Sequence, residues 1–197
     1  MASGKIASLR EQNKAATRKE LARFGVELFL KQGFDATTID QIVAPLGIAK
    51  RTFFRYFNVK EDLVFAWYED LTANLVDELK ARPKQEKPFT AVCETISSLL
   101  KLYDANPEWA LDMMRLCKET PALVGKELEK HMMWERKLVA TLIEREGKKA
   151  MSPLKAHIVV GAAMTAFSAA LNEWYAGGGK AKLRPIVERA FALAADL

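Results

Sequence analysis

Cysteine, proline and glycine are scarce in this chain of 197 residues, which contains two, seven and ten of them. The cysteines, Cys93 and Cys117, stand in apolar surroundings, and their spacing predicts neither a disulfide framework nor a zinc cage. The N-terminus lacks the apolar stretch of a secretory signal. The longest apolar stretch, His157 to Leu171, is shorter than the roughly 20 residues that cross a bilayer. We therefore expect a cytoplasmic protein without membrane contact.

Positive charge is concentrated at the N-terminal end. Residues 1–60 contain eleven Lys and Arg against five Asp and Glu, whereas the remainder contains nineteen against twenty. A charge excess confined to one end indicates a polyanionic partner, because bound cations neutralise phosphates and release counterions. Charge counts alone fit an ordinary basic surface equally well.

Apolar residues recur at helical spacing in nearly every long segment, so the predicted fold is all-α. A first helix carries Leu21, Phe24 and Phe29 on one face and ends at Gly33. Two short helices follow, one from Ile39 to the Pro45 break and one over Ala49–Tyr56. This pair, joined by a tight turn with glycine, predicts a helix-turn-helix within a three-helix head.

The rest of the chain is expected to form a larger helical domain. A helix that opens at Asn58 or Lys60 carries Leu63, Trp67, Leu71, Leu75 and Leu79, and residues 82–88 form the one convincing linker. Further helices are predicted over 89–105, 107–118, 122–146, 153–175 and 181–195, separated by Pro and Gly. The predicted domains are 10–60 and 83–197, connected by a helix over 61–82.

The segments GFDATTI (33–39), GI (47–48), TFFRYF (52–57) and KEDL (60–63) together resemble the N-terminal domain of the TetR family. The resemblance implies a DNA-binding helix-turn-helix, with phosphate contacts by Thr38, Tyr56 and Lys60. Three positions depart from the usual family pattern: Pro45 replaces Ala, Ala49 replaces Ser or Thr, and Phe54 replaces Tyr.

The chemistry of the second short helix agrees with DNA reading. Long hydrogen-bond donors stand at its leading end, where base edges of the major groove come within reach, and Arg55 follows one turn later. Phe54 offers at most an apolar contact to a thymine methyl or a sugar, whereas Phe53 and Phe57 are expected in the core. The residues predicted to contact DNA are Thr38, Lys50, Arg51, Thr52, Phe54, Arg55, Tyr56 and Lys60.

For the C-terminal part, the resemblance implies a regulatory domain that binds a small molecule and forms a homodimer through its last two helices. The sequence from 158 to 171 is apolar or small on almost every side, as a helix buried against a partner requires. Met and aromatic residues form candidate pocket walls, although such stripes are more often plain core. The candidates are Trp109, Met113, Met114, Cys117, Met133, Trp134, Phe167 and Trp174.

Parts of this region are also similar to regulators that sense fatty acyl-coenzyme A thioesters, including mycofactocin-associated ones. That similarity implies an anionic head group near Arg115, Lys118 or Arg136. The leading hypothesis is a repressor released from a palindromic double-stranded operator by a small apolar effector. One alternative is a DNA-binding dimer that answers to a protein partner or organises the chromosome. No cofactor is expected, and a helical enzyme or metal site at His131 and Glu135 is disfavoured because further ligands are missing.

Overall fold

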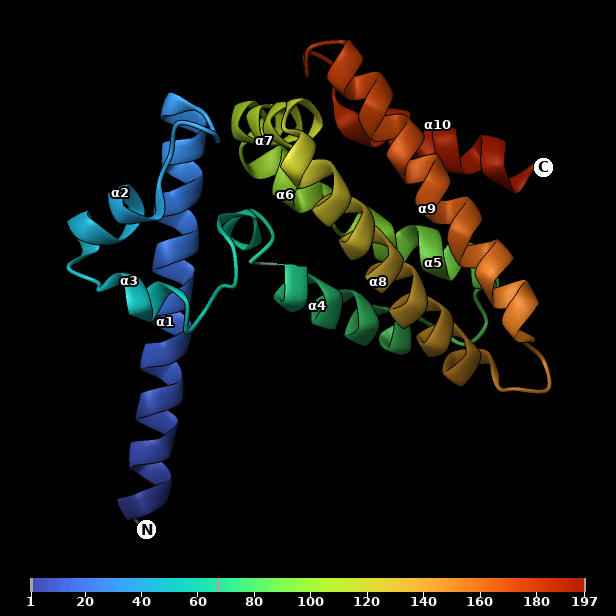
Figure 1. Cartoon of the computed structure of the whole chain (residues 1–197). Helices are drawn as coiled ribbons and strands as arrows, with labels where there is room; N and C mark the ends of the chain where they lie inside the picture. The colour runs from blue at the N-terminus through green and yellow to red at the C-terminus, as the bar shows by residue number, and fades with distance from the viewer. Residues whose placement is uncertain (1, 67, 197) are drawn as a thin grey trace. The chain divides into compact units, whose positions relative to one another are not determined.

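The computed structural model describes residues 2–66 and 68–196, with side chains from residue 13 onward, and Trp67 lies outside the described residues. The described part is built of helices without a strand, which confirms the all-α prediction (Figure 1). The N-terminal elements are α1 (Ala2–Gln32), α2 (Ile39–Val43), the 3-10 turn η1 (Ala44–Leu46), α3 (Lys50–Phe53) and the 3-10 turn η2 (Lys60–Leu63). The others are α4 (Tyr68–Ala81), α5 (Pro88–Ser97), α6 (Leu100–Ala105), α7 (Pro107–Glu119), α8 (Pro121–Glu146), α9 (Pro153–Ala176) and α10 (Leu183–Ala195).

Two compact units make up the chain. The N-terminal unit contains residues 1–69 together with 116–127, and the C-terminal unit contains 70–115 and 128–197. From Asp70 onward, helix α4 therefore belongs to the C-terminal unit, where Leu75 and Leu79 are buried in the core. The sequence predicted a domain that begins only at residue 83, and it did not predict that the end of α7 and the start of α8 group with the head.

The N-terminal unit is organised around α1. Leu21 and Phe29 of this helix are buried with Ile42, Phe53 and Leu63. Gly25 lies on the same face, and a Cβ built there would stand 2.6 Å from Leu63 Cδ1, so glycine allows η2 to approach α1 closely. Packing against α1 thus fixes the positions of α2, α3 and η2.

Two predicted helices are interrupted in the structure. The stretch from Asn58 to Leu79 contains η2, a series of turns and then α4, because Leu63, Val64, Phe65 and Ala66 are all buried and a one-sided helix cannot bury four consecutive residues. The predicted helix over 89–105 is divided into α5 and α6. Ser98 Oγ donates to Thr95 O at 2.7 Å there, and such side-chain bonds compete with the helical pattern.

The core of the C-terminal unit surrounds α9. This helix packs against α10 and α5, and eight of its residues, including Phe167 and Trp174, are buried. By length and composition α9 is apolar enough to cross a membrane, although a buried core helix passes the same test. With 24 residues, the helix is longer than the apolar stretch His157 to Leu171, which alone is too short to cross a bilayer.

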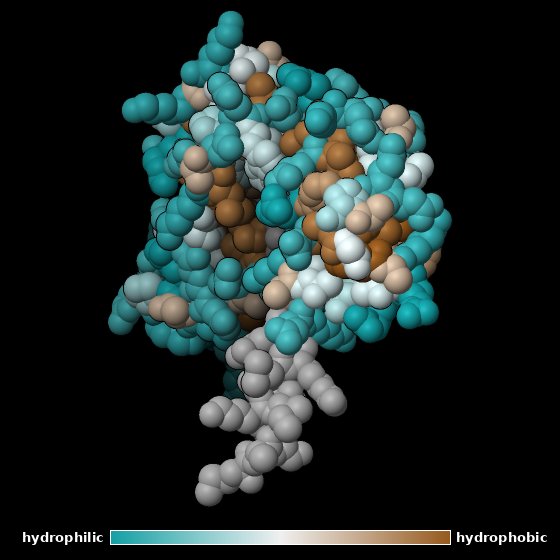
Figure 2. Space-filling model, turned by 90° about the vertical axis from the view of Figure 1, so that its left-hand side faces the viewer, coloured by the Kyte–Doolittle hydropathy of each residue, from teal (hydrophilic) through white to brown (hydrophobic). Residues whose placement is uncertain are grey.

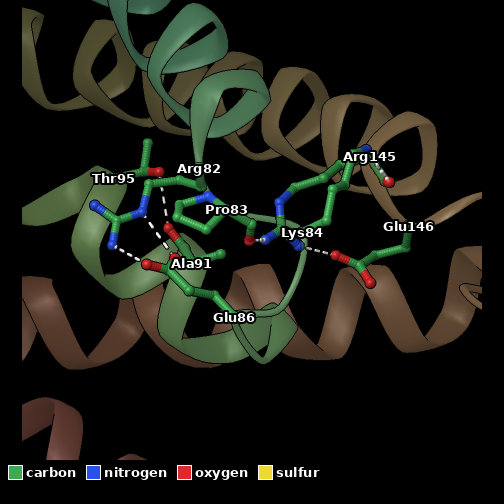
Figure 3. A network of polar contacts seen from close by, with 8 residues as sticks. All are labelled: Arg82, Pro83, Lys84, Glu86, Ala91, Thr95, Arg145 and Glu146. Carbon is green, nitrogen blue, oxygen red and sulfur yellow. Dashed lines mark hydrogen bonds and ion pairs between the residues drawn. The ribbon is translucent and has the colours of Figure 1, made fainter.

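A network of polar contacts joins the predicted linker to the end of α8 (Figure 3). The guanidinium of Arg145, whose side chain is fully buried, pairs with Glu146 and donates to Pro83 O. Lys84 Nζ donates to Arg145 O at 2.5 Å. We call these four residues the polar clasp. Its contacts fix the 82–88 stretch, which is therefore not a loose linker.

Candidate functional site

The start of α2 is closed by a capping box. Gln41 N donates to Thr38 Oγ1 at 3.3 Å, and Thr38 N donates to Gln41 Oε1 at 2.9 Å. Both side chains are exposed, so this helix start lies at the surface of the unit. A helix start with surface amides attracts anions, which agrees with the predicted phosphate contact of Thr38.

The turn between the two short helices is made by a 3-10 segment and a left-handed glycine. Pro45 occupies the first turn of η1, and Gly47 has φ +63°, a conformation that favours glycine. Ile48 N donates to Val43 O at 3.1 Å, which closes the turn. Pro45 therefore fits within the turn rather than distorting it.

The second short helix is shorter than predicted. It covers Lys50–Phe53 rather than Ala49–Tyr56, and Ala49 provides no side-chain cap at its start. Beyond it the backbone closes in three-residue turns, with Arg55 N donating to Thr52 O at 3.2 Å and Tyr56 N donating to Phe53 O at 2.9 Å. Phe53 and Phe57 are buried, as predicted from their spacing.

The outward side of this segment carries the predicted base-reading residues. Lys50, Arg51 and Arg55 are exposed, Thr52 is half-buried, and the Phe54 ring is half exposed. Arg51 makes no hydrogen bond or ion pair to the described part of the chain, so its guanidinium is available to a ligand. Phe54 packs edge-on against Phe53 at 5.4 Å between ring centroids, leaving its outer edge at the surface.

Two of the outward cations already have partners within the unit. Lys50 Nζ lies 2.9 Å from Asp40 Oδ2 in an exposed ion pair between α3 and α2. Arg55 Nη2 donates to Tyr56 Oη at 3.1 Å, and its guanidinium stands 5.0 Å from the centre of the Tyr56 ring. Exposed pairs of this kind are weak, so a phosphate or a base can replace them.

Lys60 has a different environment from the one the resemblance implied. Its ammonium donates to Phe34 O at 2.7 Å and to Thr37 O at 3.1 Å, and it lies 4.2 Å from the centre of the Phe34 ring. These contacts join the start of η2 to the loop between α1 and α2. A phosphate contact by Lys60 must compete with them.

The structure places only some of the eight predicted pocket residues near one another. Phe167 and Trp174 belong to the continuous core of the C-terminal unit, with Tyr103 edge-on to both, and Met114 and Trp134 pack against that core. Met113 is buried, whereas Trp109 and Met133 are half-buried. Cys117 belongs to the N-terminal unit, apart from the other seven.

Hydrogen bonds hold both tryptophans of this set. Trp134 Nε1 donates to Thr72 Oγ1 at 2.7 Å and thereby joins α8 to α4, while Trp174 Nε1 donates to Ala181 O at 2.8 Å. Of the candidate head-group cations, Arg115 pairs with Asp112 at 2.9 Å, and Arg136 is exposed. Trp174 is thus fixed in the core, and Trp134 lies at a junction between helices.

Large apolar side chains reach the surface on the last two long helices. Leu154 and Ile158 of α9 are 73% and 62% exposed, and Leu193 of α10 is 64% exposed. Figure 2 views the molecule from the left-hand side of Figure 1, and this face is hydrophilic over most of its area, with hydrophobic patches between the polar side chains. Both helices of this pair therefore present large apolar side chains to solvent among the described residues.

The described residues contain no group of three His, Cys, Asp or Glu side chains that could hold a metal ion. Sequence reasoning also missed several polar contacts within the two units. Neither the double hydrogen bond of Lys60 nor the buried guanidinium of Arg145 has a sequence signal, because each depends on carbonyls distant along the chain. Arg18 Nη1 donates to Ala66 O at 2.9 Å. The sequence gives a weak signal for this contact, because Arg18 stands at helical spacing from the buried Leu21.

Comparison with known proteins follows the division into an N-terminal and a C-terminal part. Residues 23–67 match the bacterial regulatory proteins of the tetR family, and residues 86–197 match the MftR C-terminal domain. The chain is 29% identical over 173 residues to the HTH-type transcriptional regulator TcmR of Streptomyces glaucescens, covering 85% of this chain and 76% of TcmR. It is 22% identical over 162 residues to the putative mycofactocin biosynthesis transcriptional regulator MftR of Mycobacterium tuberculosis, covering 79% and 80% of the two chains.

Solved structures share the fold. FadR of Thermus thermophilus, a TetR-family repressor in complex with lauroyl-CoA, superposes with a TM-score of 0.59 at 19% identity, covering 90% of this chain and 93% of that one. FadR of Bacillus subtilis, in complex with stearoyl-CoA, superposes with a TM-score of 0.58 at 17% identity, covering 89% and 96%. At these identities the likeness concerns the arrangement of the helices.

Proposed function

The chain belongs to the TetR family of bacterial transcriptional regulators, and from this premise we propose that it is a homodimeric cytoplasmic repressor of a two-fold symmetric operator, released by an acyl-type ligand. Proteins of this family are regulators rather than enzymes, as the sequence predicted. The observation that carries the proposal is the separation of buried and exposed side chains along residues 50–57. Phe53 and Phe57 anchor the segment in the core, while Lys50, Arg51 and Arg55 remain exposed on its outer side.

Arg51 is the residue on which base reading depends most. Its guanidinium is exposed and without a partner in the described chain, and it stands in the first turn of α3. A helix that enters the major groove presents that turn to the base edges, where arginine can donate two hydrogen bonds to guanine. Lys50 and Arg55 would exchange their exposed intramolecular contacts for DNA, at little cost.

The test is binding to an operator selected from random duplexes, followed by fluorescence anisotropy. Arg51→Ala should lower the affinity for the operator at least about fivefold, because a bidentate contact is worth about 1–3 kcal/mol, and should lower it less on random DNA. Arg51→Lys is the matched control, since it keeps the charge and removes the bidentate geometry. It should retain random-DNA affinity and still bind the operator more weakly. Equal losses of affinity on both kinds of DNA would contradict base reading by Arg51.

The dimer is proposed through α9 and α10. The carrying feature is their exposed apolar face, with Leu154, Ile158 and Leu193 each more than half exposed. Two copies of such a helix pair form a four-helix interface related by two-fold symmetry. Ile158→Glu should convert the dimer to a monomer in light scattering after size exclusion. The matched control, Ala140→Glu on an exposed position of α8, should remain dimeric. A dimeric Ile158→Glu variant would place the interface elsewhere.

The acyl ligand is proposed from two supports. Solved relatives of the same fold, the FadR proteins, are described in complex with lauroyl-CoA and stearoyl-CoA. In this chain, Met114 and Trp134 pack half-buried against the C-terminal core, and Trp134 is bonded to Thr72 of α4. A ligand at Trp134 would therefore act on α4, the first helix of the C-terminal unit. A ligand shifts the protein only if it prefers the conformation that does not bind DNA.

Titration of the operator complex with lauroyl-CoA and stearoyl-CoA tests this part. We expect release from DNA and a change in tryptophan fluorescence, with free coenzyme A as the control that lacks an acyl chain. Operator affinity that is unchanged by both thioesters would contradict the acyl ligand. That result would favour the alternative of a DNA-binding dimer regulated by a protein partner, and it would leave the helix-turn-helix proposal intact.

A further inference from the structure

Much of the N-terminal positive charge lies ahead of the helix-turn-helix. Residues 1–22 contain five Lys and Arg against two Asp and Glu, and the family match begins only at residue 23. The same residues form the first two thirds of α1, which continues beyond α3 toward the N-terminus (Figure 1). This part of the helix is therefore basic, and the family match does not account for it.

One face of α1 changes from apolar to basic along its length. Phe29, Gly25 and Leu21 lie on the buried side, and the same spacing of three or four residues continues through Arg18 and Lys14 to Arg10. Lys14 is exposed and makes no hydrogen bond or ion pair to the described part of the chain. The face that packs on the head thus continues through Arg18 to Lys14, and Arg10 follows at the same spacing in the sequence. We call these three residues the α1 basic row (Arg10, Lys14, Arg18).

Arg18 fixes the position of this row relative to residues 50–57, which we call the DNA-reading segment. Its Nη1 donates to Ala66 O at 2.9 Å, its Nη2 lies 3.4 Å from Glu69 Oε2, and its guanidinium stands 5.4 Å from the centre of the Phe57 ring. Phe57 comes two residues after Arg55. The row therefore begins beside the end of the DNA-reading segment and runs away from it along α1.

We propose that the α1 basic row binds the phosphates of the duplex that flanks each operator half-site. This inference rests on the proposed DNA-binding function and adds a contact outside the helix-turn-helix. From Arg18 to Arg10 the helix rises about 12 Å, which corresponds to about three or four base pairs along one strand. Binding would neutralise phosphates and release counterions without reading the sequence.

The composition of the segment favours DNA over a membrane surface. Residues 13–20 contain no large apolar side chain, whereas a helix that lies on a membrane needs an apolar face. Residues 13–16 are all exposed, so this turn of α1 has no packing partner in the described chain. A helix without packing is only marginally stable in water, and phosphate contacts would stabilise it in the complex.

The test compares two duplexes with the same operator, one carrying ten base pairs of flanking DNA on each side and one trimmed at the half-sites. Arg10→Ala/Lys14→Ala should weaken binding to the long duplex several-fold. The slope of log affinity against log salt should fall by about 0.9 for each phosphate that the variant no longer neutralises. Binding to the trimmed duplex should not change. Arg18 is not substituted, because its contacts with Ala66 O and Glu69 stabilise the N-terminal unit. Lys101→Ala, at an exposed lysine of α6, is the matched control.

The outcomes separate this inference from the function on which it rests. If the wild-type protein binds neither duplex specifically, the proposed function fails. If it binds both and the double variant behaves as wild type on the long duplex, only the α1 basic row is overturned. A decrease of equal size on both duplexes also overturns it, because the contacts would then lie inside the half-sites. Arg51→Ala should bind the operator more weakly on both lengths, and thermal melting verifies that every variant is folded.

Discussion

Lys60→Met separates a structural role of Lys60 from the phosphate contact that the family resemblance implied. The ammonium donates to Phe34 O and Thr37 O and faces the Phe34 ring at 4.2 Å. Hydrogen bonds of a charged donor contribute about 1.5–3 kcal/mol, and a cation over an aromatic ring contributes about 0.5–1 kcal/mol at an exposed site and more beside a buried ring such as Phe34. Because Lys60 is half-buried, water replaces part of this after substitution. We expect the free energy of unfolding to fall by about 2 kcal/mol.

The assay is urea unfolding followed by circular dichroism, together with amide hydrogen exchange in the loop between α1 and α2. Methionine keeps the length of the side chain and removes the charge, so the decrease reports the ammonium. Lys101→Met is the control at an exposed lysine and should leave the unfolding free energy unchanged. If unfolding and exchange are unaffected and the salt slope of DNA binding falls by about 0.9, Lys60 is a phosphate contact and the structural reasoning is refuted.

Three further predictions concern the buried ion pair of Arg145, the helix cap at Thr38 and the two cysteines. Arg145→Met should lower the unfolding free energy by about 3 kcal/mol, because it removes one partner of a buried ion pair; an unchanged urea midpoint would contradict the clasp. Thr38→Ala should lower the unfolding free energy by about 1 kcal/mol because it removes the N-cap of α2, whereas Thr38→Ser should keep both the cap and the stability. Burial raises the pKa of both the Cys93 and Cys117 thiols to about 12. Their alkylation at pH 8 should be about a thousandfold slower than in the unfolded chain, and their contribution to stability, complete below pH 9, should decline as pH rises toward 12. Rapid labelling of the native protein would show that they are accessible.

Local patterns predicted much of this structure because many determinants lie close together in the sequence. Prolines 107, 121 and 153 each stand at the first position of a helix, where the missing N–H has no cost, and α7, α8 and α9 begin there. The spacing of Phe53 and Phe57 identified them as core residues, and both are buried. The family resemblance indicated the helix-turn-helix, since its motif segments follow one another closely within residues 33–63.

The remaining features depend on contacts between distant residues. The helical pattern over 58–79 continues through Leu63 and Trp67, yet the chain turns after Leu63, where Ala66 O accepts a hydrogen bond from Arg18. No local pattern shows that Lys60 donates to carbonyls more than twenty residues away. Candidate pocket residues were chosen by composition, which cannot separate a core residue such as Trp174 from a residue at a helix junction such as Trp134.

The polar clasp holds the 82–88 stretch in place against the end of α8. Its Pro, Lys and Gln content is typical of a flexible linker, but Arg145 and Lys84 tie it to the end of α8, and Arg82 donates to Glu86 at 2.5 Å. That hydrogen bond lowers the pKa of Glu86, so the pair persists to a lower pH than the ordinary pKa of a glutamate would allow. Both ends of α4 are consequently held: the clasp fixes its exit, and Trp134 bonds to Thr72 near its start. Under the proposed function, a ligand that displaces Trp134 would free the start of α4 while the clasp still holds its end. Trp134 is for this reason the position at which the proposed ligand would act on α4.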